Sequence, residues 1–238
     1  MRLKKLTLFT KQLLKQFHFY NEILGFPIPS KGARYVEFLA GDSILRFEES
    51  TISTPYHFAF NVPSNQIHSS KDWLKKRTQI IVDDGVEVIP FDFWNAEAVY
   101  FYDADNNIVE FIARKNLKIE SEEKFSPQSI LNISEIGIPV NDIHPIFNRL
   151  NEELSLEMYS GNLERFSAIG DEEGLFIVIN KKHKKTWFPT NDTPISSDFS
   201  AIIENRGKRY KIRFTHQNIY THELKPNHHS FAEFGEIC

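Results

Sequence analysis

The sequence has almost no cysteine: the only one among its 238 residues is Cys238, the last residue. A single thiol cannot build a disulfide framework or a thiolate-ligated metal cluster, so the sequence excludes both. Such a composition is typical of a reducing compartment. We therefore expect a cytoplasmic protein.

Long apolar runs and a strong charge of one sign are also missing. The N-terminal stretch is interrupted by Lys11 and Lys15 and lacks a small-residue cleavage site, so it does not match a signal peptide, and no run is long enough to span a bilayer. A net charge of −4 creates no basic field for nucleic acid. The one basic run, KKHKK at residues 181–185, lies between strand-like segments and predicts a solvated hairpin tip. We expect neither a nucleic-acid nor a membrane partner.

What the sequence does contain is a repeated pattern. Three times an alternating strand leads through a polar breaker into an amphipathic helix, in LKKLTLFTKQLLKQFHFYNEILGF, YHFAFNVPSNQIHSSKDWLKKRTQII and ISEIGIPVNDIHPIFNRLNEEL. Strand-like segments follow each helix, such as RYVEFLA and SILRFEE in the first unit. The repeated unit is therefore a strand, a helix and two or three more strands.

A charged segment without clean periodicity, residues 115–131, separates the second unit from the third. It predicts a linker between a first domain of residues 1–114, which contains two units, and a second domain of residues 132–238. After the third unit, SDFSAIIEN and KRYKIRF would begin a fourth, but the expected helix is missing. The pattern indicates an α+β fold whose second domain is an abbreviated version of the first.

Alternation along the strands assigns side chains to two faces. Phe58 and Phe60 share a wholly apolar face that we expect to lie against the helices, whereas His57 belongs to the opposite face. The same division gives each of four strands one titratable group among mixed residues. These groups, Lys5, Arg46, His57 and Glu110, should line a cavity or a partner surface.

Three motifs within residues 1–114, LTLFTKQLLKQFHFYNEILGF, HFAFNVP and DADNNIVEF, together resemble the glyoxalase / bleomycin resistance / extradiol dioxygenase proteins, the vicinal oxygen chelate superfamily. A weaker likeness covers SEIGIPVNDIHPIFNRL. The resemblance implies paired βαβββ modules that close into a cupped, half-open barrel of mixed sheet. It also implies a small-molecule ligand in the cup, often beside a divalent metal, and in some members a homodimer.

In metal-dependent members of that superfamily, the ligands lie on the first and last strands of each unit. His57 and Glu110 match these positions in the second unit, which implies that they act as metal ligands or catalytic groups. In the first unit the matching residues are Lys5 and Arg46, which donate no lone pair and repel a cation. The departure predicts a degenerate metal site in which Lys5 and Arg46 replace the ion and one of them forms a salt bridge with Glu110. The cluster either binds an anionic ligand or has a purely structural role, in which its charged groups pair only with one another.

Other candidate ligands were weaker. Glu135 occupies the first-strand position of the third unit, but its partner strand LFIVINK offers only apolar residues, which favours a polar edge group. The acidic run from Asp103 to Asn107 lacks the spacing of a calcium loop and predicts a tight turn. His228 and His229 belong to a terminal tail that we expect to pack loosely or to be disordered, and adventitious metal binding is the alternative.

Two functions remain open at this point. The first is a protein that binds a small anionic or oxygen-rich molecule in the cup with no cofactor, as in the drug-resistance members that the resemblance implies. The second is a lyase or ring-cleaving dioxygenase that uses His57 and Glu110 to bind zinc, nickel, iron or manganese. The departures at Lys5 and Arg46 favour the first function, with no cofactor expected, and the metal-dependent enzyme is the alternative.

Overall fold

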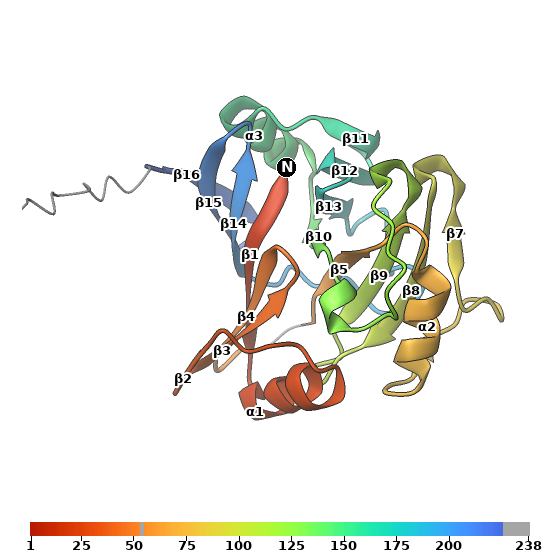
Figure 1. The fold of residues 1–238 in the computed structure, drawn as a ribbon. Coiled ribbons are helices and arrows are strands. Elements are labelled where there is room, and N and C mark those ends of the chain that lie inside the picture. The colour runs from red at the N-terminus through yellow and green to blue at the C-terminus, as the bar shows by residue number, and fades with distance from the viewer. Residues whose placement is uncertain (53–54, 226–238) are drawn as a thin grey trace, which may run out of the picture.

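The computed structural model describes residues 1–52 and 55–225. Within these ranges, sixteen strands form one mixed sheet, and the helices lie on its outer side (Figure 1). The α+β fold class is therefore confirmed. No helix among the described residues is long and apolar enough to cross a bilayer.

The elements follow the repeated units. Unit one contains β1 (Arg2–Thr10), α1 (Leu13–Phe17) with its π-helical continuation η1 (His18–Ile23), β2 (Ser30–Gly32), β3 (Tyr35–Ala40) and β4 (Ser43–Glu49). Unit two contains β5 (His57–Val62), α2 (Ile67–Lys75), β6 (Ile80–Ile81), β7 (Ile89–Phe91), β8 (Ala96–Tyr102) and β9 (Ile108–Arg114). Unit three contains β10 (Asn132–Val140), α3 (His144–Leu154), β11 (Met158–Gly161), β12 (Phe166–Asp171) and β13 (Gly174–Asn180). Unit four contains β14 (Phe199–Asn205), β15 (Lys208–Thr215) and β16 (Asn218–Leu224), with no helix between these described strands.

Within each complete unit, the first and last strands lie side by side and parallel. The register repeats: Lys5 of β1 is opposite Ile44 of β4 as His57 of β5 is opposite Ile108 of β9. Two residues further along, Arg46 and Glu110 occupy matching places on β4 and β9. Lys5 and Arg46 are thus the structural equivalents of His57 and Glu110.

Pairing between units departs from the sequence order. β5 of unit two pairs antiparallel with β10 of unit three, and β1 of unit one pairs antiparallel with β14 of unit four. Figure 1 shows β1 beside β14 and β5 beside β10. We call the concave surface of units two and three cup A, and that of units one and four cup B.

The expectation that units one and two close one cup is therefore wrong. β10 lies between β1 and β5 in the sheet, and it joins β1 only through the pair Leu3 and Ile133. The end of the linker is held by unit one, because the Asp42 amide donates to the Leu131 carbonyl. Each cup therefore combines strands from both sides of the linker, and the division into domains at residues 114 and 132 stays a prediction.

The assignment of strand faces is confirmed. Phe58 and Phe60 are fully buried in the main apolar core together with Leu74 of α2. Their rings meet edge to face, with centroids 5.6 Å apart. His57, the neighbour of Phe58, lies on the other side of the sheet, where it lines a cavity. Burial of the apolar face against the helices thus orients the polar groups toward the cups.

Candidate functional site

A cavity of about 360 Å³ lies on the concave side of cup A. His57 from β5, Glu110 from β9 and Glu135 from β10 contribute to its wall. All three side chains are almost completely buried, and one nitrogen or oxygen atom from each lies within 4.8 Å of the others. Three strands from two units therefore bring an imidazole and two carboxyl groups together.

His57 is held as a neutral imidazole. Its Nδ1 is 3.3 Å from the Ile108 carbonyl oxygen, so Nδ1 carries the proton and donates it there. Burial lowers the pKa of His57 to about 4. Nε2 then keeps its lone pair, and this atom faces Glu110 Oε2 at 3.6 Å. Since burial also favours a protonated Glu110, the pair is a contact between neutral groups and not a salt bridge.

Glu110 lies between a hydroxyl group and another carboxyl group. Burial and the negative charge of Glu135 raise the pKa of Glu110 well above its usual value. Tyr100, directly opposite on β8, hydrogen-bonds to it, and burial together with Glu110 raises the pKa of that phenol strongly. In the absence of a cation, this environment favours a protonated Glu110 carboxyl.

Glu135 has a charged partner instead. The guanidinium of Arg114, at the end of β9, donates from Nη2 to Glu135 Oε1, and both side chains are buried. Burial raises the pKa of Glu135, and the Arg114 charge opposes that rise. Because Arg114 occupies only one carboxylate oxygen in this hydrogen bond, the other oxygen is left for a further ligand.

Aromatic side chains form most of the remaining wall, among them Phe91, Phe93, Trp94, Trp187 and Phe188. Trp187 packs on His57 with ring centroids 4.9 Å apart. It fits there because position 137 is glycine: a Cβ on Gly137 would lie 2.7 Å from the Trp187 ring. The connection of residues 181–198 from β13 to β14 thus carries part of the cavity wall.

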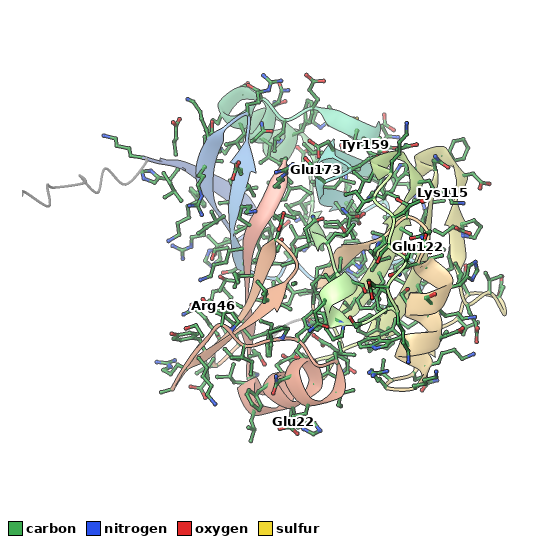
Figure 2. The ribbon with its side chains drawn as sticks, in the orientation of Figure 1. Glu22, Arg46, Lys115, Glu122, Tyr159 and Glu173 are labelled. Carbon is green, nitrogen blue, oxygen red and sulfur yellow. The ribbon has the colours of Figure 1, made fainter. Side chains whose placement is uncertain are left out.

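Lys5 and Arg46 do not take part in this group. Lys5 Nζ lies 2.5 Å and Arg46 Nη1 2.9 Å from the same oxygen, Glu37 Oε1, in cup B. Figure 2 shows Arg46 on the side of β3 and β4, well away from Tyr159 of β11, which belongs to unit three and so to the side of cup A. The expected salt bridge between either cation and Glu110 does not occur among the described residues. The reason is the pairing of the units, which places the equivalent positions in separate cups.

Glu135 is the member of the group that sequence reasoning set aside. The sequence pattern favours an edge group here because the partner strand offers no second ligand, and Ile177 of β13 does occupy the place that Glu110 has on β9. A usable signal was its position on the first strand of a unit, equivalent to His57. That signal points to Glu135 only when unit three, rather than unit one, is placed beside unit two.

The remaining sequence candidates have structural roles or cannot be placed. Asp103 accepts hydrogen bonds from the amides of Asp105 and Asn107, and Asn106 has a left-handed φ of 59°, which confirms the predicted tight turn. The KKHKK run is not a hairpin tip, because it opens the connection of residues 181–198. His228 and His229 lie outside the described residues.

The group fits a divalent metal ion by its chemistry. A neutral imidazole nitrogen and two carboxylates are usual ligands for zinc, iron, nickel and manganese. Ligand atoms on opposite sides of one ion are at most about 4.4 Å apart for bonds of about 2.2 Å, so small side-chain rotations would complete the set from its present 4.8 Å spread. His57 already has the hydrogen bond from its second nitrogen that orients a ligating imidazole.

Comparison with known proteins supports the fold. No family model and no curated protein matches the sequence. Among solved structures, a proposed dioxygenase from Bacillus subtilis subsp. subtilis str. 168 is 12% identical over 94% of this chain and 84% of its own, with a TM-score of 0.63. The V278E glyoxalase I mutant from Zea mays is 13% identical over 74% of this chain and 66% of its own, with a TM-score of 0.50. The protein therefore has the fold of the glyoxalase / bleomycin resistance / dioxygenase proteins, as the sequence motifs predicted.

Proposed function

We propose that cup A binds a divalent metal ion through His57, Glu110 and Glu135, together with a small molecule that has an oxygen-bearing end. The observation that supports this most directly is the convergence of three buried ligand side chains at an aromatic-walled cavity. A bound ion would supply Lewis acidity toward an oxygen atom of the small molecule. This is the chemistry of a lyase or dioxygenase rather than of a passive carrier.

The residues of the chain would then have distinct tasks. Arg114 holds one oxygen of Glu135 and compensates its charge. Tyr100 hydrogen-bonds to Glu110 and would hold this carboxylate in position when it is deprotonated. Ile177, in the place of a fourth ligand, leaves one side of the site open and apolar. The aromatic wall excludes water from the reacting end of the ligand.

A metal-free binding protein is the second candidate. One observation favours it: Arg114 already neutralises Glu135, and a protonated Glu110 needs no cation. The group is then self-compensated, and the cavity would hold its ligand by packing and hydrogen bonds. A homodimer, which the resemblance implied, stays a prediction under both candidates.

Metal titration of the full-length protein separates these candidates. Replacing His228 and His229 with alanine first removes the adventitious ligands of the tail. We expect this background protein to bind one equivalent of zinc, nickel, iron or manganese. Because Glu110→Gln removes a carboxylate ligand while preserving shape, it should weaken metal affinity by more than about 100-fold, which exceeds the usual effect of changing a residue that only hydrogen-bonds to a ligand.

The matched control is Glu37→Gln, which changes the same residue type in cup B and should leave metal affinity unchanged. His57→Ala provides an independent test, because it removes a neutral group and disturbs no ion pair. Absence of stoichiometric metal in the background protein, or retention of it in both His57→Ala and Glu110→Gln, would reject the metal site. The first of these outcomes would favour the metal-free candidate.

A further inference from the structure

Lys184 is a cation in the wall of the cup A cavity. It lines the cavity together with Trp187 and Phe188 and is partly buried. Its ammonium group has no ion pair or hydrogen bond to any other side chain in residues 1–52 and 55–225. Its neighbour Lys185 is exposed and does not line the cavity, so the placement of Lys184 is specific.

The charged group that acts on Lys184 is another cation, Arg165, so it does not neutralise the ammonium group. Burial and the positive charge of Arg165 lower the pKa of Lys184. The two carboxyl groups of the cavity wall have other partners: Arg114 forms an ion pair with Glu135, and Glu110 lies against His57 and opposite Tyr100. Lys184 is therefore available to an anion that enters the cavity.

The wall also specifies the shape of the ligand. Phe93 is fully exposed and Phe188 is 39% exposed, although both border the cavity. Phe188 meets Phe91 and Tyr100 edge to face at 6.0 and 6.3 Å between ring centroids. Solvent-facing aromatic rings around a cavity are typical of a site that packs a planar apolar group.

We propose that the ligand of cup A is a small aromatic carboxylate and that Lys184 binds its carboxylate group while the aromatic wall packs its ring. The proposal deepens the function proposed above, because it places the ligand in the same cavity. Its anion-binding part does not require a metal ion. Lys184 is then a specificity-determining residue that selects acids over neutral aromatic compounds.

Calorimetric titration of the full-length protein with phenylacetate and with its neutral analogue phenylacetamide tests the proposal. A charged hydrogen bond lost from a partly buried site weakens binding by roughly 10-fold to 100-fold. We therefore expect Lys184→Met to weaken phenylacetate binding by at least about 10-fold and to leave phenylacetamide binding unchanged. Lys184→Arg should retain most of the phenylacetate affinity, and Lys185→Met, which removes the same charge from an exposed neighbour, should retain all of it.

Three outcomes would overturn the proposal: no binding of phenylacetate at millimolar concentration, equal affinity of the natural protein for both probes, or equal loss in Lys184→Met and Lys185→Met. Metal titration of Lys184→Met separates this result from the fate of the metal site. If Lys184→Met keeps its metal and loses selectivity for the acid, both proposals stand. If no variant binds metal but acid selectivity still depends on Lys184, only the metal site fails.

Discussion

The two cups are built from equivalent strands but hold opposite kinds of polar cluster. In cup A, His57, Glu110 and Glu135 are at most 6% exposed, and they border a cavity. In cup B, the equivalents Lys5 and Arg46 form ion pairs with Glu37, and their side chains are 29% and 19% exposed. Arg46 also lies 3.7 Å over the Tyr35 ring. The comparison shows that equivalent positions on one fold can carry a buried cluster beside a cavity in one cup and partly exposed ion pairs in the other.

The difference in burial predicts a large difference in what an ion pair contributes. Arg114→Met should destabilise the protein by about 3–5 kcal/mol, because it leaves Glu135 buried without its cation. Lys5→Met, the matched change in cup B, should cost about 0–1 kcal/mol, since water and Arg46 still surround Glu37. Urea unfolding of both variants provides the measurement.

A double variant, Arg114→Met with Glu135→Leu, sharpens that comparison. Replacing both members of a buried pair with apolar groups should recover most of the lost stability. If Arg114→Met costs no more than Lys5→Met, the two clusters do not differ in the way that their burial indicates.

A smaller loss is expected from a change at Gly137 of β10, which contacts Trp187 in cup A. Gly137→Ala would bring a methyl group within 2.7 Å of Trp187 and 3.2 Å of the His57 carbonyl oxygen. We expect a cost of about 1–3 kcal/mol from this overpacking, together with a change in the fluorescence of Trp187. Trp187→Phe removes the clashing ring atoms, so the double variant should lose less stability than the sum of the two single variants. Strict additivity would show that Trp187 does not rest on Gly137.

The two cups should also respond to pH with opposite sign, by at most about 1.4 kcal/mol per pH unit for one proton. The pKa of Glu110 is raised in the folded state, so the stability that this carboxyl contributes is present below its ordinary pKa of 4.5 and is lost as pH rises. Hydrogen bonds from Lys5 and Arg46 outweigh desolvation and lower the pKa of Glu37. Its contribution is therefore present above 4.5 and is lost as pH falls.

Unfolding free energies of Glu110→Gln and Glu37→Gln, measured in the presence of a chelator, test this sign. The advantage of the natural protein over Glu110→Gln should shrink as pH rises above 4.5, whereas its advantage over Glu37→Gln should shrink as pH falls below 4.5. Parallel pH profiles for the two variants would mean that the carboxyl groups share one kind of environment.

Much of the fold followed from local patterns. Helical spacing and strand alternation indicated the repeated units, and the alternation at Phe58 and His57 correctly assigned the core face and the cavity face. The matching registers of β5–β9 and β1–β4 also confirm that Lys5 and Arg46 occupy the positions in unit one that His57 and Glu110 occupy in unit two. These features depend on residues close together in the chain or on one strand pair, so the sequence contains them directly.

What the tertiary structure alone decided is which units meet. Local alternation orients Glu135 toward the concave face of β10, but nothing local says whether β10 or β1 will lie beside β5. Pairing of β5 with β10 brings Glu135 to His57. Pairing of β1 with β14 instead leaves Lys5 in the other cup, where its partner is Glu37 of its own unit. Strand pairing across more than seventy residues depends on the combined burial and hydrogen bonding of whole sheets, and no short segment encodes that sum.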